Sequence, residues 1–174
     1  DASPASSTAS ESVMAAEVTV VRVAGRRAVL EPVWLARAEP VHRALRPDLP
    51  ADYARTLQGI FDDGGEMAVA VRDDQVVGVA VFRCHRNTSC GMHFYVDDLV
   101  TAPAARSQGV GKALLDWLAH EAAARGATRL RLDSGTQRID AHRFYHREGM
   151  HIACFLFSRD LSTAPQRHPT RGKA

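Results

Sequence analysis

The segment from Arg106 to Lys112 carries the pattern with the clearest chemical meaning in this sequence. Its residues are Arg-Ser-Gln-Gly-Val-Gly-Lys, and a helix is predicted to start within it and run over residues 110–125. The unpaired N–H groups at a helix start, together with the positive end of the helix dipole, attract anions. Glycines at 109 and 111 would let the backbone approach an anion closely, and the two cationic side chains add positive charge. The segment therefore predicts a site for a phosphate or pyrophosphate group.

Two well-known phosphate-binding patterns do not fit this segment. It lacks the third glycine of the dinucleotide-binding fingerprint, and no Gly-Lys-Ser/Thr stands at the spacing of a P-loop. Glycines at a helix start are a weak signal by themselves, so the nature of the ligand has to come from other residues.

Side chains that could move a proton stand on both sides of this segment. Asp97 and Asp98 lie in a predicted strand, and alternation along a strand would place them on opposite faces. At most one of them would then face a molecule bound on one side of the sheet. Either carboxylate is a candidate general base, and His93, on the same face as Asp97, is a candidate relay. Tyr145 is a candidate general acid, because a phenol with a pKa of about 10 stays protonated at neutral pH.

These residues need a scaffold of strands and helices in a definite order. The middle of the chain predicts an antiparallel meander, and the part after Pro103 predicts alternating helices and strands. Strands are predicted over 18–24, 67–72, 76–82, 92–101, 128–133 and 151–159, and helices over 51–61, 110–125 and 138–148. The region 28–61 has a helical pattern interrupted by prolines, so only its second half is predicted as a clear helix. This order indicates an α/β domain with one mixed central sheet flanked by helices.

Three motifs in this order resemble those of the GNAT superfamily of N-acetyltransferases. Arg106-Ser-Gln-Gly-Val-Gly111 resembles the Arg/Gln-x-x-Gly-x-Gly/Ala signature, whose loop holds the pyrophosphate of coenzyme A in that family. Asp98-Leu-Val-Thr101 stands where the family has a splayed strand whose backbone pairs with the pantetheine arm and the acetyl carbonyl. Ala141-His-Arg-Phe-Tyr-His-Arg-Glu-Gly-Met150 resembles the second hallmark, Ala-x-x-Phe/Leu-Tyr-x-x-x-Gly-Phe. With the upstream meander, the resemblance covers residues 18–160.

Some positions depart from the family pattern. Ser107 stands where glycine is common, and Met150 replaces the usual phenylalanine. Arg138 stands where many members place an asparagine that contacts coenzyme A, which puts that contact in doubt.

The resemblance implies a GNAT fold in which a splayed strand pair forms the acetyl-CoA cleft. It also implies acetyl-CoA as co-substrate, direct attack by an amine in a ternary complex, and a backbone N–H on residues 99–101 that meets the oxyanion. The cofactor-binding residues it implies are Leu99, Val100, Thr101, Arg106, Ser107, Gln108, Gly109, Val110, Gly111 and Lys112. No covalent nucleophile is required, so the cysteines are expected to be bystanders.

The same resemblance implies roles for the proton-transfer candidates. Tyr145 stands where the family keeps a tyrosine aimed at the thioester sulfur. Asp97 resembles the acidic residue through which polyamine acetyltransferases deprotonate the amine by way of water, and it is the preferred base. Asp98 could equally be that base, contact the substrate or cap the following turn, and Ser134 could hydrogen-bond the substrate or simply stand in a turn.

Composition limits the remaining function classes. The chain has 174 residues, of which 45% are hydrophobic, which predicts one domain with a proper core. No apolar run is long enough to span a membrane, and a net charge of +2 is too small to argue for nucleic acid. Three cysteines without framework spacing predict reduced thiols in the cytoplasm, and the gap between Cys84 and Cys90 matches no common zinc site, so no metal is expected. The high content of arginine and alanine suggests a bacterium.

The predicted layout is a flexible N-terminal tail over 1–16, an N-acetyltransferase domain over 17–160 and a basic C-terminal tail over 161–174. The first residues lack the basic and apolar regions of a secretory signal. The apolar residues 152–157 in the last predicted strand could pair across a homodimer, as in many relatives.

The acceptor amine stays open at this point, and either a small molecule or a peptide could supply it. The paired acidic residues favour a small cationic amine, such as an antibiotic, a polyamine or an amino-acid derivative. A basic flank on the helix 138–148 would instead suit an acceptor that carries a carboxylate or phosphate. A longer acyl-CoA or an aminoacyl-tRNA as donor, and a non-catalytic module that binds coenzyme A, are the alternatives.

Overall fold

The computed structural model describes residues 16–25 and 27–161. These residues form two compact units, and the division falls between Asp133 and Ser134. The two predicted tails lie outside the described residues, apart from residues 16 and 161.

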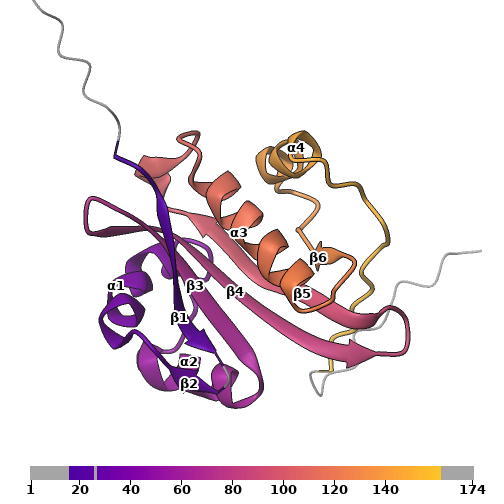
Figure 1. Cartoon of the computed structure of the whole chain (residues 1–174), viewed down its shortest axis with the longest axis horizontal. Coiled ribbons are helices and arrows are strands. Elements are labelled where there is room, and N and C mark those ends of the chain that lie inside the picture. The colour runs from indigo at the N-terminus through magenta and orange to yellow at the C-terminus, as the bar shows by residue number, and fades with distance from the viewer. Residues whose placement is uncertain (1–15, 26, 162–174) are drawn as a thin grey trace, which may run out of the picture. The chain divides into compact units, whose positions relative to one another are not determined.

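The first unit is built on a six-stranded sheet with the strand order β2-β1-β3-β4-β5-β6 (Figure 1). All neighbouring strands are antiparallel except β5 and β6, which are parallel. The strands are β1 (Thr19–Gly25), β2 (Ala28–Val29), β3 (Gly65–Arg72), β4 (Gln75–Asn87), β5 (Gly91–Thr101) and β6 (Leu130–Leu132). The helices of this unit are α1 (Pro32–Arg43), α2 (Tyr53–Asp62) and α3 (Val110–Ala124), with a short 3-10 turn, η1 (Pro103–Ala105), before α3. The predicted mixed sheet with flanking helices is confirmed.

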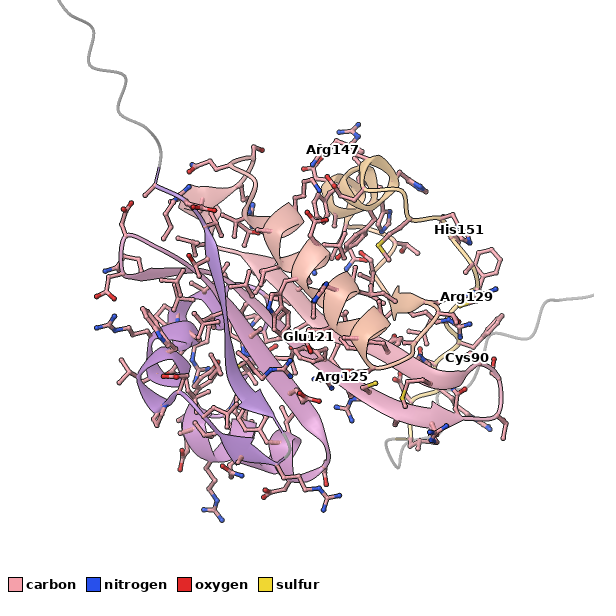
Figure 2. All side chains as sticks on the ribbon, viewed as in Figure 1. Cys90, Glu121, Arg125, Arg129, Arg147 and His151 are labelled. Atoms are coloured by element: carbon pink, nitrogen blue, oxygen red, sulfur yellow. The ribbon has the colours of Figure 1, made fainter. Side chains whose placement is uncertain are left out.

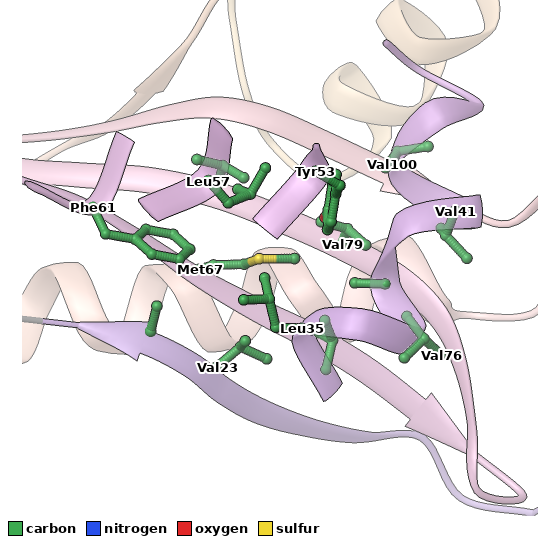
Figure 3. Packing of buried hydrophobic residues seen from close by; sticks show 14 residues of the cluster. Val23, Leu35, Val41, Tyr53, Leu57, Phe61, Met67, Val76, Val79 and Val100 are labelled. Atoms are coloured by element: carbon green, nitrogen blue, oxygen red, sulfur yellow. The ribbon is translucent and has the colours of Figure 1, made fainter. Parts of the chain in front are cut away.

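The helices cover both faces of this sheet because its strands alternate apolar side chains between two cores. On β3, Met67 and Val69 belong to the core under α1 and α2, whereas Ala68 and Ala70 belong to the core under α3. Figure 3 shows the first core, where side chains from both helices gather around Met67. Polar residues that interrupt the apolar positions of either core are therefore candidates for a functional role.

Helix α1 differs from its prediction, because it continues through a proline. Pro32 stands in the first turn, where its fixed φ suits a helix start, but Pro40 lies inside the helix. That proline removes one backbone N–H and its bond to the carbonyl four residues earlier. Leu35 and Val41, on either side of the break in hydrogen bonding, are buried in the core and keep the helix against the sheet.

Strand β5 carries an irregularity and an open edge. Val81 pairs with Asp98 while the next residue, Phe82, pairs with Val96, so Asp97 is the extra residue of a β-bulge. On its other side β5 pairs with β6 only from Phe94 to Val96. Within the described part of the chain, the edge of β5 beyond Val96 therefore has no neighbouring strand, as the predicted splay requires.

The second unit contains α4 (Ile139–Arg147), which agrees with the helix predicted over 138–148. The strand predicted over 151–159 is wrong, because the structure has no strand after α4 up to residue 161. Ile152, Phe155 and Phe157 are instead exposed. An apolar, β-prone composition does not form a strand unless a neighbour supplies backbone hydrogen bonds, and no described strand pairs with this segment.

Candidate active site

The loop before α3 has the backbone geometry of an anion site. Gly109 caps the helix with a φ of 82°, a left-handed conformation that glycine adopts without strain. The first bond of the helix ladder runs from the Ala113 N–H to the Gly109 carbonyl at 2.9 Å. The N–H groups of Val110, Gly111 and Lys112 precede that bond, so the helix does not use them.

Side chains around this loop fix its shape and its charge. Gln108 donates from Nε2 to the carbonyl of Ala104 at 2.9 Å, which closes the loop on itself. Arg106 is exposed, and the Lys112 ammonium lies 2.7 Å from the Asp116 carboxylate. Ser107 adopts a φ of 59°, which explains why glycine suits this position in the family motif.

The open edge of β5 runs toward this loop through η1. The Ala102 N–H bonds to the Val77 carbonyl of β4 at 2.8 Å, so alternation along the strand directs the backbone polar groups of Leu99 and Thr101 away from β4. The backbone polar groups of Val100 face β4, and its side chain is buried in the core. Of the three predicted residues, Leu99 and Thr101 are thus the ones that can pair with a ligand lying along the open edge.

The bulge changes where the two aspartates point. We expected alternation to place Asp97 and Asp98 on opposite faces, and this is wrong, because the extra residue of the bulge breaks the alternation. Asp97 Oδ2 accepts from Arg83 Nε at 2.7 Å, and Arg83 follows Phe82 of the α3-side core, so it lies on the other face. Asp98 contacts the α1 side of the sheet as well, and both carboxylates therefore lie on the face that α1 and α2 cover.

Asp98 is more buried than Asp97 and has more partners. Its Oδ2 lies 2.9 Å from His42 Nε2, and its Oδ1 accepts from Arg46 Nε at 2.7 Å. Burial opposes ionisation of this carboxyl group, but the hydrogen bonds from His42 and Arg46 outweigh burial and hold its pKa below the usual value. Asp98 is therefore a weak base whose two oxygens are already occupied.

A row of aromatic and imidazole rings continues from the aspartates along the same face. His93 stacks on His85 at 5.1 Å between ring centroids, and the Tyr95 ring meets His93 edge-on at 5.6 Å. Burial, followed by the charges of His85 and Arg131, lowers the pKa of His93. Its Nδ1 contacts the Asn87 amide, and its Nε2 is buried without a hydrogen-bond partner among the described residues.

Several residues of this face had no place in the sequence prediction. They are His42, Arg46, Tyr53, Arg83 and Tyr95, whose hydroxyl contacts the Asp133 carboxylate. His42 lies in the last turn of α1, and Arg46 follows the helix, with its N–H bonded to the His42 carbonyl at 3.0 Å. The prolines in this region obscured that spacing in the sequence. Arg83 and Tyr95 pair across β4 and β5, a register that the sequence does not reveal.

The second unit holds the remaining two candidates. Tyr145 is half-buried on α4, with its ring 5.4 Å from that of Phe144, and its carbonyl accepts from the Met150 N–H at 2.9 Å. The hydroxyl of Ser134 is buried and has no hydrogen-bond partner within the part of the chain that the structure describes.

Neither a metal centre nor a membrane-spanning helix is found among the described residues. No group of three or more histidine, cysteine, aspartate or glutamate side chains is placed to hold a metal ion there. No helix among those residues is long and apolar enough to cross a membrane.

Comparisons with known proteins agree with this geometry. The sequence profile of the Acetyltransferase (GNAT) family matches residues 30–150. The chain is 32% identical over 129 residues to the uncharacterized N-acetyltransferase YhdJ of Bacillus subtilis, covering 72% of this chain and 91% of that protein. It is 34% identical over 106 residues to the aminoalkylphosphonate N-acetyltransferase of Salmonella typhimurium, covering 59% of this chain and 67% of that protein.

Solved structures show the same fold. An aminoglycoside N-acetyltransferase, AAC(6')-Iy in complex with CoA, superposes with a TM-score of 0.70 at 15% identity, over 86% of this chain and 98% of that one. A transcriptional regulator from Bacillus halodurans superposes with a TM-score of 0.64 at 26% identity, over 83% of this chain and 99% of that one.

The open strand edge beside a glycine-capped helix start agrees with the family profile and the relatives, which identify the chain as an acyltransferase. The chain belongs to the GNAT family of acetyltransferases, since the family profile covers more than half of its length. The resemblance inferred from the three sequence motifs is confirmed.

Proposed function

We propose that this enzyme transfers the acetyl group of acetyl-CoA to the primary amine of a small molecule or peptide by direct attack in a ternary complex. The observation that carries the proposal is the open edge of β5, which leads through η1 directly into the anion-binding start of α3. A ligand with an amide-containing arm and a pyrophosphate fits these two features in this order.

The residues present fit acetyl-CoA as the donor substrate. The backbone groups of Leu99 and Thr101 would pair with the pantetheine arm, as a neighbouring strand would. The N–H groups of Val110 and Gly111 at the start of α3, together with the cations of Arg106 and Lys112, would hold the pyrophosphate. When bound, the donor supplies an activated thioester carbonyl, and the Leu99 N–H is the group on this chain best directed to stabilise its developing oxyanion.

Asp97 is the base in this proposal. Arg83 occupies one of its oxygens, whereas both oxygens of the neighbouring Asp98 are occupied, so Asp97 keeps an oxygen for the acceptor ammonium or for a water that relays its proton. The neutral amine then attacks the carbonyl carbon, the carbon–sulfur bond breaks, the nitrogen releases its extra proton to solvent, and the leaving thiolate takes a proton. Tyr145 is the proposed donor of that proton, on the basis of its place in the second family motif.

We further propose that the acceptor carries an acidic group beside its amine. The face around the bulge holds charges of both signs, with Asp97 and Asp133 beside Arg46 and Arg83. Arg83 donates from Nε to Asp97, and its terminal N–H groups have no hydrogen-bond partner among the described residues. The relative at 34% identity is named for aminoalkylphosphonates, which combine an amine with an acidic phosphorus group. Ser134 remains a proposed substrate contact.

A panel of amines tests both parts of the proposal. Thiol release from acetyl-CoA should be measured with aminoalkylphosphonates, amino acids, an aminoglycoside, a polyamine and a peptide with a free N-terminus. The proposal expects the highest kcat/KM with an aminoalkylphosphonate or another amine that carries an acidic group. A polyamine as the best substrate would contradict the acceptor class only. Tight binding of acetyl-CoA without release by any amine would contradict the reaction and favour a binding module, and release from a longer acyl-CoA alone would indicate another donor.

The three cysteines are unpaired, as expected in a reducing compartment. We therefore propose the cytoplasm as the location of the enzyme.

A further inference from the structure

A chain of polar side chains lies buried behind the bulge of β5. His42 is 1% exposed and is the polar side chain found fully inside the described part of the molecule. Its Nδ1 lies 3.0 Å from the Tyr53 hydroxyl of α2, and its Nε2 lies 2.9 Å from Asp98 Oδ2 of β5. Three elements that are distant in the sequence are thus connected through one imidazole.

The chemistry of the partners assigns the direction of each hydrogen bond. Asp98 is ionised, because its pKa lies below the usual value, and an ionised carboxylate only accepts. His42 therefore carries its hydrogen on Nε2, and Nδ1 accepts from the Tyr53 hydroxyl. Burial, together with the nearby Glu39, raises the pKa of Tyr53 and keeps this hydroxyl protonated as a donor. Each polar side-chain atom of His42, Tyr53 and Asp98 then takes part in a hydrogen bond.

Arg46 holds the bulge from the solvent side. Its Nε donates to Asp98 Oδ1 at 2.7 Å, and its Nη2 lies 3.5 Å from the carbonyl oxygen of Asp97. The hydrogen bond to Asp98 is the main reason why the pKa of Arg46 is raised. Arg46 and His42 together therefore contact both residues at which the register of β5 shifts.

Stability alone does not explain a buried contact between an imidazole and a carboxylate. A buried imidazole and carboxylate lose hydration that apolar side chains of similar volume do not lose, so apolar side chains at both positions 42 and 98 would serve the core at least as well. A bulge, in contrast, lacks regular ladder bonds at its extra residue, and its conformation needs support from elsewhere. The His42–Asp98–Arg46 group supplies that support one residue before Leu99.

We infer that His42 and Arg46 are positioning residues that clamp the β5 bulge and thereby aim the Leu99 N–H at the acetyl carbonyl. This inference rests on the proposed function for its catalytic part. The clamp itself is a property of β5 that can be measured without catalysis, so the two can fail separately.

Arg46→Gln is the primary test, because the Arg46 side chain is 55% exposed and its replacement leaves the core intact. Arg37→Gln is the matched control, since Arg37 is 45% exposed and also pairs with an aspartate, Asp74 Oδ2, at 3.0 Å. Three quantities are measured on each variant: the Kd for acetyl-CoA by calorimetry, kcat with the best amine, and backbone hydrogen–deuterium exchange of peptides covering β3, β4 and β5.

The clamp predicts that Arg46→Gln lowers kcat by about tenfold or more, since a small misplacement of a stabilising donor is costly. It also predicts faster exchange confined to residues 95–101 and a Kd for acetyl-CoA that rises by a smaller factor than kcat falls, because the loop before α3 is untouched, while Arg37→Gln matches the wild type. His42→Leu should show the same pattern, and His42→Gln, which keeps an N–H donor for Asp98, should restore most of the activity. Exchange that stays at the wild-type rate in β5, or that rises equally across all three strands, would overturn the clamp. If no amine is acetylated by the wild type, the proposed function fails, and the exchange pattern still decides on the clamp.

Discussion

Asp97 and Asp98 are adjacent aspartates on one strand, yet their surroundings give them different chemistry. Asp98 is 13% exposed and bonded through both oxygens, whereas Asp97 is 28% exposed and bonded through one. A carboxylate with occupied oxygens and a lowered pKa is poorly suited to accept a proton. The difference comes from the bulge, which turns both side chains to the same face but only one into the core.

The assignment of the base can be tested with Asp97→Asn. We expect kcat to fall by about a hundredfold, because the amide cannot accept the proton of the ammonium group, while the Kd for acetyl-CoA stays at its wild-type value. Steady-state rates with the best amine measure the first quantity and calorimetry the second. Asp74→Asn, at an exposed aspartate paired with Arg37, is the matched control. Activity of Asp97→Asn within a few-fold of the wild type would show that another group accepts the proton.

At the residue scale, the sequence predicts the backbone conformation of the loop before α3 well and the placement of the acidic pair poorly. The residues from Arg106 to Lys112 are contiguous, so their geometry follows from one local element, and Ser107 needs only a left-handed φ. The roles of Asp97 and Asp98 depend on a register shift against β4 and on His42 from a distant helix. Such long-range contacts leave no local pattern in the sequence.

At the element scale, the position of α3 depends on its approach to β4 at Gly78. A Cβ atom built at this glycine would lie 2.8 Å from Leu114 Cδ1 and 2.9 Å from Val110 Cγ1. Both residues belong to the start of α3, whose N–H groups are predicted to bind an anion. The absence of a side chain at position 78 therefore lets the anion-binding end of the helix lie close to the sheet.

Gly78→Ala should displace that helix start. We expect a loss of about 1–3 kcal/mol in the free energy of unfolding, as for other overpacked cores, and a higher Kd for acetyl-CoA. Urea unfolding and calorimetry measure the two effects. Gly59→Ala is the control, because Gly59 lies within α2 with nothing within 4 Å of an added Cβ, and alanine should stabilise the helix. A Gly78→Ala variant as stable as the wild type would contradict close packing at this point.

The element predictions from the sequence succeeded where the apolar period was strong and failed where it was misleading. Helix α3 and strands β3 and β5 appear close to their predicted ranges, because their alternation and helical spacing are clear, whereas β4 continues to Asn87 instead of ending at Phe82. Helix α1 was obscured by Pro40, which tertiary packing tolerates. The segment 151–159 has the composition of a strand, but pairing decides whether a strand forms.

At the scale of the whole first unit, an ion-pair network joins β1, β3 and α3. Arg22 and Arg125 both bond to Glu66, with Arg22 Nη1 at 2.7 Å and Arg125 Nη2 at 2.9 Å from Oε2, and both contact Glu121. Figure 2 shows Glu121 and Arg125 on the same side of α3, one turn apart. These partly buried charges hold α3 to the strands at the end opposite to the anion site.

This network makes stability depend on pH in a definite direction. Burial of the Glu121 carboxyl is outweighed by the hydrogen bond and charge of Arg22 and by Arg125, so its pKa is lowered. A group with a lowered pKa stabilises the fold above its unfolded pKa of about 4.3, and this contribution is lost as the pH falls through the folded value. We expect the free energy of unfolding to fall below about pH 4, and to fall less steeply in Glu121→Gln. Asp74→Asn, in an exposed pair with Arg37, serves as the control, and an identical pH slope in Glu121→Gln would contradict this role.

The central claim is that the acetyl group passes directly from acetyl-CoA to an amine held beside β5. The most direct measurement supplies acetyl-CoA labelled in the acetyl group, with and without the best amine, and follows the label by mass spectrometry. Direct transfer predicts that the label appears on the nitrogen of the acceptor when the amine is present, and never on the protein. Label on a cysteine of the protein, or no labelled product although acetyl-CoA binds tightly, would contradict it.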